Sequence, residues 1–437
     1  MRLHARQGDT ATERPAARKP ARRYELDWLR TLVVLGLIPV HTASIFTPSA
    51  DLYLKAPQTS AAMILVGVFA GVFGMALLFF VAGAATWFAL GSRTSGRYVR
   101  ERILRLLVPL VFATLVVIPI QVYVVTLSNP SLVSLIGAPI YDPHFLDSFP
   151  RFYPQYLLSY GYFLTHPSVD GFIAFFGHLW FLLYLFVFSL IALPLFVYLR
   201  STHGLRQIDR LAAFCARPGA IFALAIPLAL VDALAHAVWT GVGAAAETLV
   251  YLTCFVYGYA LYADPRVRQA IRRQWIPSLV AGMGLWLLAE LFLVQFPPRP
   301  YDNSMGTLLS IPLRGIIAWF WVVGLVGFGM TYLSRTSRLL RYLSDAAYPV
   351  YVMHVAAIVS VGYLLLGWQA PLLVKFFVIM AAAFLITFGI YEALIKRVRA
   401  LRLLFGLRAM PASESPPPES PESPESPTSL IATRAPA

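Results

Sequence analysis

Arg30 and His41 lie in one apolar stretch near the start of the chain, RYELDWLRTLVVLGLIPVHTASIF (23–46), with no charged residue between them. Ionisable side chains at membrane depth are costly and usually serve a function. A helix rises about 1.5 Å per residue, so His41 is expected roughly 20 Å beyond Trp28, in the outer half of a bilayer, while Arg30 stays near the inner face. Imidazole titrates near neutral pH, so His41 is a candidate general base for a hydroxyl. The alternative is a histidine that only packs.

Four arginines crowd the segment RYVRERILRLLVP (97–109). Arg102 and Arg105 are three residues apart, which places both on one face of an α-helix. A guanidinium group binds phosphate through two parallel hydrogen bonds. The spacing therefore predicts a site for a phosphorylated cytosolic molecule, although arginine is also enriched at the inner membrane face for topological reasons.

Other ionisable residues fall inside apolar stretches, which favours a polar interior cavity. They are Asp232, Glu247, Glu290, Arg314, Lys375, Glu392, His178, His236 and His354. There is no Gly-x-Ser-x-Gly or His-Glu-x-x-His pattern and no closely spaced carboxylate pair. Cys215 and Cys254 have no metal-ligand spacing, and no metal site is predicted.

The elements that must position these residues are membrane-spanning helices. The chain has 437 residues, of which 58% are hydrophobic and 13% charged, and its mean hydropathy is +0.68. Stretches of about 20 apolar residues cross a bilayer as helix, and runs of this length without alternation exclude a β-barrel. Ten spans are predicted, an all-α polytopic fold: 28–48, 62–90, 103–126, 172–199, 219–238, 244–262, 276–296, 307–333, 346–367 and 371–395. The small-residue pairs Gly67/Gly71 and Gly324/Gly327 are predicted to be helix contacts.

The basic residues predict the orientation. One set of alternate loops contains Arg93, Arg97, Arg100, Arg102, Arg200, Arg206, Arg210, Arg217, Arg266, Arg268, Arg272, Arg273, Arg335, Arg338 and Arg341. The opposite loops contain Lys55, Arg151 and Arg299. Cytoplasmic loops are rich in Lys and Arg, so both termini are expected in the cytoplasm. The net charge of +14 therefore reflects membrane topology and does not indicate nucleic acid as a partner.

Several segments resemble the acyltransferase 3 family of ten-span membrane acyltransferases. They are the basic residue and histidine eleven positions apart (Arg30 to His41), the Arg-x-x-Arg pair (Arg102 and Arg105), FFVAGAATWF (79–88), GHLWFLLYL (177–185) and YPVYVMHV (348–355). The resemblance runs from about 24 to 400, and GHLWFLLYL is similar to the branch of periplasmic glucan succinyltransferases. The expected domains are a basic cytoplasmic arm (1–27), the membrane acyltransferase domain (28–400) and a disordered Pro/Ser/Glu-rich cytoplasmic tail (409–437).

The resemblance implies transfer of an acyl group from cytosolic acyl-CoA to a hydroxyl of an extracytoplasmic carbohydrate or related acceptor. His41 is then the catalytic base, and acyl-CoA is a donor substrate without a permanently bound cofactor. The donor is expected to be held by Arg102, Arg105, Arg100 and Arg30. The substrate-lining residues are expected to be His178, Trp180, Arg314 and His354.

The expected location is the bilayer of the bacterial inner membrane. Two other classes remain open from the sequence. A transporter or flippase of a polar or lipid-linked solute also has buried charges, although no internal repeat is evident. A membrane receptor or sensor is the third class, and no pattern specifically favours it.

Overall fold

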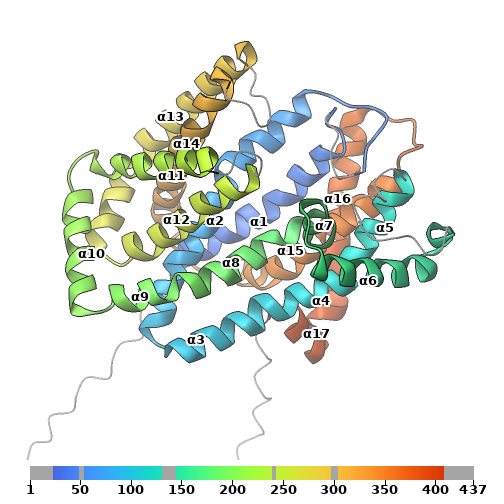
Figure 1. Cartoon of the computed structure of the whole chain (residues 1–437), viewed down its shortest axis with the longest axis horizontal. Coiled ribbons are helices and arrows are strands. Elements are labelled where there is room, and N and C mark those ends of the chain that lie inside the picture. Colours follow the sequence, from blue (N-terminus) through green and yellow to red (C-terminus); the bar gives the residue numbers. More distant parts are fainter. Residues whose placement is uncertain (1–22, 49–53, 130–143, 239–242, 297–303, 408–437) are drawn as a thin grey trace, which may run out of the picture.

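The structure, a computed structural model, describes residues 23–48, 54–129, 144–238, 243–296 and 304–407. The described residues form helices and connecting turns, with no strand among them (Figure 1). The predicted arm and tail, apart from residues 23–27, lie outside the described residues.

The helices run in chain order as follows: α1 Tyr24–Ser44, α2 Ala62–Gly91, α3 Ser95–Arg102, η1 Ile103–Leu107, α4 Val108–Val116, α5 Ile118–Ser128, η3 Phe145–Asp147, α6 Phe149–Thr165, α7 Val169–Phe176, η4 Gly177–Leu179, α8 Trp180–Ile191, α9 Leu193–Leu199, α10 Thr202–Cys215, η5 Ala220–Leu224, α11 Ala225–Val238, α12 Gly243–Tyr262, α13 Pro265–Gln295, α14 Met305–Tyr332, α15 Arg338–Leu364, α16 Leu372–Ile390, η6 Tyr391–Ile395 and α17 Arg399–Leu404.

Nine helical stretches of the described chain are long and apolar enough to cross a membrane. They are Tyr24–Ser44, Ala62–Gly91, Ser95–Ser128, Ala174–Ile191, Ala220–Ala237, Pro265–Gln295, Met305–Tyr332, Arg338–Leu364 and Leu372–Ile395. The remaining predicted span, 244–262, forms α12 but is not among the nine; Glu247 and several tyrosines reduce its apolar character. The protein is an all-α polytopic integral membrane protein.

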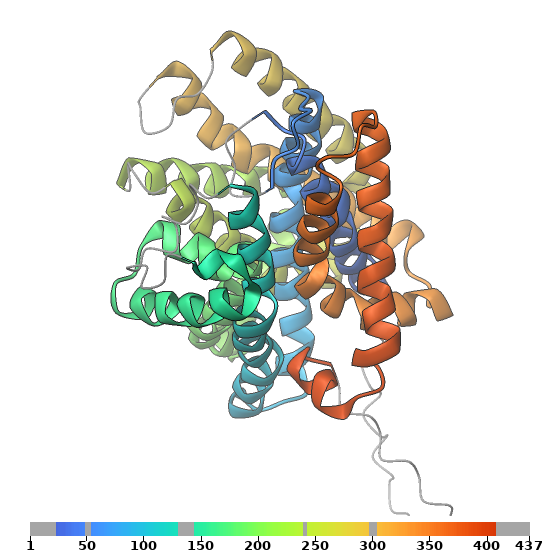
Figure 2. The same ribbon diagram turned by 90° about the vertical axis from the view of Figure 1, so that its right-hand side faces the viewer.

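Helix α1 lies near the centre of the molecule, beside α2 and facing α15 and α16 (Figure 1). It also contacts α14. Figure 2 shows α16 along one side of the molecule, with α17 folded across its lower end. Because α1 is surrounded by other helices, a polar residue in its middle faces protein on several sides.

Close packing of α2 and α12 depends on two glycines. A Cβ at Gly83 would collide with the carbonyl oxygen of Phe255, and a Cβ at Gly258 would collide with that of Phe80. Small residues allow two helix backbones to approach this closely within a membrane.

Of the two glycine pairs predicted to be helix contacts, one is confirmed. Gly324 and Gly327 lie against Leu279 and Trp275 of α13. The prediction for Gly67 and Gly71 is wrong, because a Cβ at either position meets no described atom within 4 Å.

Two prolines interrupt the helix that enters the third span, and tyrosines from other helices repair the interruptions. Proline has no N–H, so it leaves the carbonyl four residues earlier without its helical partner. At Pro109 the missing N–H affects the carbonyl of Arg105, which accepts a hydrogen bond from Tyr348 Oη at 2.8 Å instead. At Pro119 the missing N–H affects the carbonyl of Leu115, which accepts a hydrogen bond from Tyr153 Oη at 3.1 Å.

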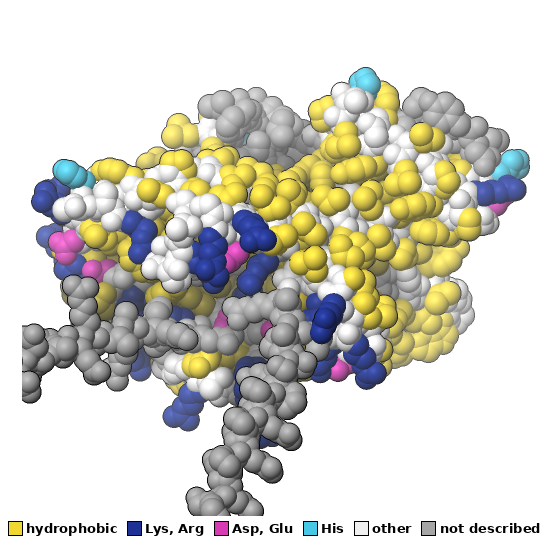
Figure 3. Space-filling model, turned by 90° about the horizontal axis from the view of Figure 1, so that it is seen from below, with side chains coloured by type: hydrophobic (Ala, Val, Ile, Leu, Met, Phe, Trp, Pro, Cys, Tyr) yellow, Lys and Arg dark blue, Asp and Glu magenta, His cyan; other side chains and the backbone are white. Residues whose placement is uncertain are grey.

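The ends of the helices that carry the arginine-rich loops meet at one end of the bundle. Trp28, at the start of α1, donates to the carbonyl oxygen of Arg335 at 3.3 Å. Glu25 accepts from Tyr262 Oη at 2.6 Å, beside the start of α13. Figure 3 shows the molecule from below, where Lys and Arg side chains gather next to a broad hydrophobic area.

Candidate active site

Three histidines from distant parts of the chain lie together inside the bundle. His41 comes from α1, His178 from η4 and His354 from α15. The ring centroids of His178 and His354 are 4.8 Å apart, those of His41 and His354 5.1 Å, and those of His41 and His178 6.5 Å. His178 and His354 are buried and His41 is half-buried. We call these three residues the histidine cluster.

A short 3₁₀ turn brings His178 to α15. Gly177 has a φ of +46°, a left-handed conformation that favours glycine. The turn after it directs the carbonyl oxygen of His178 to Tyr351 Oη at 2.5 Å, and His178 Nε2 to the carbonyl oxygen of Val352 at 3.2 Å. These two contacts fix both the backbone and the ring of His178 against α15.

The hydrogen bonds of two imidazoles define their tautomers. A carbonyl oxygen only accepts, so the ring nitrogen bonded to it carries the proton. His178 is therefore protonated at Nε2, and His354 is protonated at Nδ1, which lies 2.7 Å from the carbonyl oxygen of Tyr351. The opposite nitrogens, His178 Nδ1 and His354 Nε2, have no hydrogen-bond partner among the described residues. In neutral histidines both are acceptors, suited to a ligand that presents hydroxyl groups.

Trp180 and Arg314 belong to a different group of side chains. Arg314 of α14 donates to Asp232 of α11, with Nη2 2.7 Å and Nε 3.2 Å from the carboxylate oxygens. It also forms an ion pair with Glu247 of α12. Tyr251 Oη donates to Glu247 at 3.3 Å, and its ring stacks on Trp180 with centroids 5.7 Å apart. Asp232, Glu247 and Arg314 are called the ion-pair cluster below.

Aromatic rings connect the two clusters. Tyr351 contacts Phe181, Phe181 contacts Phe79, and Phe79 stacks on Tyr251, with centroid distances of 6.2, 4.8 and 5.3 Å. A continuous aromatic wall thus runs from the histidine cluster to the ion-pair cluster.

At the arginine-rich end, Arg102 is half-buried and held in place. Its Nη2 donates to Thr86 Oγ1 at 3.0 Å, and its guanidinium lies 4.7 Å from the centroid of the Tyr98 ring. Tyr98 Oη and Thr86 Oγ1 are 3.3 Å apart. Arg102 has five N–H donors, and among the described residues one of them is used in a side-chain hydrogen bond.

The other predicted donor-binding arginines are placed differently. Arg105 is exposed and lies within η1, a π-helical segment, so the α-helical spacing that predicted one common face with Arg102 does not apply there. Arg100 is exposed. Arg30 is exposed and forms an ion pair with Asp27 at 3.7 Å.

Sequence reasoning missed two residues that lie beside these clusters. Gln121 of α5 is buried, with its Oε1 lacking a hydrogen-bond partner among the described residues, and its Nε2 would lie 3.4 Å from a Cβ at Gly177. Tyr251 was also missed, although its position four residues after Glu247 is the helical spacing that brings two side chains together. Within the described residues, no group of three or more His, Cys, Asp or Glu side chains is placed to hold a metal ion.

The fold is that of an integral membrane protein with three histidines gathered inside its helical bundle. The chain belongs to the acyltransferase 3 family, since a family model described as an acyltransferase domain matches residues 23–392. The protein is accordingly an acyltransferase. No curated protein and no solved structure matches the chain.

Proposed function

We propose that the protein transfers an acyl group from cytosolic acyl-CoA to a hydroxyl of an extracytoplasmic carbohydrate or related acceptor, in the bacterial inner membrane. The observation that carries this proposal is the histidine cluster within an acyltransferase bundle. It offers a half-buried imidazole beside two buried ones whose free nitrogens suit hydroxyl hydrogens.

In the proposed reaction, the acceptor hydroxyl gives its proton to His41 as its oxygen attacks the carbonyl carbon of the thioester. The carbon–sulfur bond then breaks, and the CoA thiolate takes the proton back from the His41 imidazolium. His178 and His354 accept hydrogen bonds from neighbouring hydroxyl groups and so orient the acceptor. General-base help of this kind needs no covalent enzyme intermediate.

The acceptor is proposed to extend along the aromatic wall toward the ion-pair cluster. Trp180 provides a stacking surface, and Arg314 provides charge-assisted hydrogen bonds. Glu247 keeps 41% of its side chain exposed, so its carboxylate is open to an acceptor hydroxyl.

The donor is proposed to bind at the arginine-rich end, with its phosphates on Arg102 and on Arg105, Arg100 and Arg30 around it. The available N–H donors of Arg102 support this assignment. The thioester then reaches inward to His41, roughly 16 Å along α1 from Arg30. Within the family we propose the glucan succinyltransferase branch, which makes succinyl-CoA the first donor to test.

Both termini are proposed to be cytoplasmic, because the arginine-rich loops mark the inner face. A cysteine introduced at Arg335 should resist a membrane-impermeant thiol reagent in intact cells, and one introduced at Arg151 should react. Labelling with the opposite pattern would reverse the orientation.

Replacing Arg102 with alanine is expected to raise the KM for acyl-CoA about tenfold or more, because each charge-assisted phosphate contact contributes roughly 1.5–3 kcal/mol. Lysine should restore part of the affinity, since it keeps the charge but loses the bidentate fork. Arg97→Ala is the matched control, because that side chain is 70% exposed and pairs with Glu101. Equal donor affinity in the Arg102 and Arg97 variants would remove Arg102 from the donor site.

The function itself is tested by release of free CoA thiol. Purified protein in nanodiscs is given succinyl-CoA or acetyl-CoA, with and without glucan oligosaccharides, and the glycan mass is measured. Acceptor-dependent thiol release with an acyl-sized mass increase supports the proposal. Movement of an unmodified solute across vesicles, without thiol release, would support a transporter.

A further inference from the structure

A cavity of about 490 Å³ opens at the arginine-rich end, between the start of α1, the start of α13 and the end of α14. This volume lies within the range of small-molecule sites, roughly 300–1,000 Å³. Its polar lining consists of Arg23, Glu25, Arg268, Gln269, Arg272 and Ser334. We call this space the arginine cavity.

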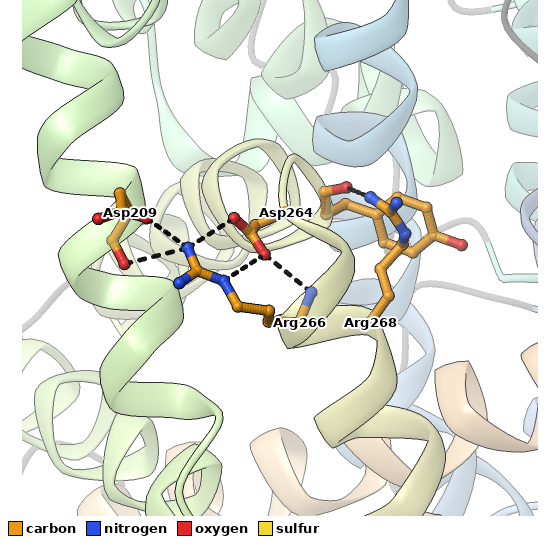
Figure 4. Close-up of polar contacts among 5 residues, drawn as sticks. Asp209, Asp264, Arg266 and Arg268 are labelled. Atoms are coloured by element: carbon orange, nitrogen blue, oxygen red, sulfur yellow. Dashed lines mark hydrogen bonds and ion pairs between the residues drawn. The ribbon is translucent and has the colours of Figure 1, made fainter.

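Two arginines of the same helix turn have contrasting partners (Figure 4). Arg266 is neutralised, with Nη2 2.5 Å from Asp209 Oδ1 and 3.0 Å from Asp264 Oδ2. The hydrogen bonds from Arg266 lower the pKa of Asp264, so this carboxylate remains charged. Arg268 points the other way and donates to the carbonyl oxygen of Tyr262 at 2.6 Å. Its charge faces the cavity without a carboxylate partner among the described residues.

The lining carries three arginines and one acid, Glu25. Glu25 is buried, and it accepts the hydrogen bond from Tyr262 at 2.6 Å and lies 4.0 Å from Arg23 Nη1. The buried Nε of Arg23 has no hydrogen-bond partner among the described residues. The single acid therefore leaves the cavity with an excess of positive charge.

Arg272 adds to this excess. It is exposed and follows Arg268 by four residues, so both lie on one face of α13, and like charges at this spacing repel. Among the described residues, Arg272 has no ion pair or hydrogen bond from its side chain. An anion between the two guanidinium groups would relieve the repulsion and use their planar donors.

We propose that the arginine cavity binds a phosphate-bearing group, held by Arg268 and Arg272 with Arg23 at its edge. Inner-face enrichment in arginine accounts for solvated residues such as Arg273, but not for three arginines around one cavity. The phosphate is carried either by the nucleotide part of a CoA molecule, in addition to the contact proposed at Arg102, or by an anionic lipid headgroup. The first source rests on the proposed function, whereas the second does not.

The test compares Arg272→Gln with Arg273→Gln, neighbouring exposed residues of equal charge, of which only Arg272 lines the cavity. Binding of adenosine 3′,5′-bisphosphate is measured in nanodiscs of neutral lipid, and thermal stability is compared between neutral and phosphatidylglycerol nanodiscs. We expect about tenfold weaker nucleotide binding, or loss of the stabilisation by phosphatidylglycerol, in the Arg272 variant alone. Arg268→Gln should give the same result.

Loss of nucleotide binding assigns the phosphate to a nucleotide, and loss of lipid stabilisation assigns it to a headgroup. The proposal is overturned if both probes treat the Arg272 and Arg273 variants alike. Neither probe contains an acyl group or an acceptor, so such a failure leaves acyl transfer untouched. Thiol release by the wild-type protein shows separately whether the proposed function holds.

Discussion

Substitution of His41 with glutamine is expected to lower the rate of acyl transfer by about 10²–10⁴-fold, the usual contribution of a general base. Glutamine keeps a hydrogen-bonding side chain of similar reach but cannot accept a proton at working pH. His178 and His354 are not expected to replace it, because hydrogen bonds to the carbonyl oxygens of Val352 and Tyr351 hold their rings in other positions. Thiol release by purified protein measures the rate.

The same variant should bind acyl-CoA with nearly wild-type affinity, since His41 lies far from the arginine-rich end. This retained affinity is the control for folding. A glutamine variant that turns over within about threefold of wild type, far less than base removal costs, would demote His41 to packing or binding. The base would then be sought at His178 and His354.

Replacing Arg314 with alanine is expected to destabilise the protein by about 3–5 kcal/mol, because it leaves the fully buried carboxylate of Asp232 without its counter-charge. Asp232 is 0% exposed, so water does not compensate for the lost partner. The free energy of unfolding in mixed micelles measures the effect.

The double variant Arg314→Ala, Asp232→Ala is the control, since it removes both charges. It should be more stable than the single variant, because the buried carboxylate is removed as well, and Glu247, which also loses its partner, keeps 41% of its side chain exposed. If the single and double variants unfold alike, the Arg314–Asp232 pair is not a structural unit, and the loss reflects packing alone. Activity of the double variant then tests the proposed acceptor contact of Arg314.

Hydropathy predicted the spans well, because burial of apolar length in lipid depends on local composition. Its weakest result is 244–262, where Glu247 pairs with Arg314 of α14 and two tyrosines donate to carbonyl oxygens of other helices. Asp232 and Arg314 were recognised as charges at depth, but their pairing depends on how α11, α12 and α14 pack. Composition along one segment carries no information about that packing.

The histidine cluster illustrates the same limit. Spacing within one helix identified His41 and placed it roughly 20 Å beyond Trp28. The meeting of α1, η4 and α15 depends on long-range contacts and on the positive φ of Gly177. The assumption of a regular α-helix also failed at 103–107, where a π-helical segment precedes Pro109.

The pH dependence of the transfer rate, measured for wild type and His41→Gln at saturating acyl-CoA, tests the general base most directly. A base acts only when unprotonated, so the wild-type rate should fall as the pH is lowered through the titration of the imidazole. The residual rate of the glutamine variant should lack this acidic fall. If the glutamine variant keeps the same acidic fall as wild type, another group accepts the proton and the assignment of His41 is contradicted.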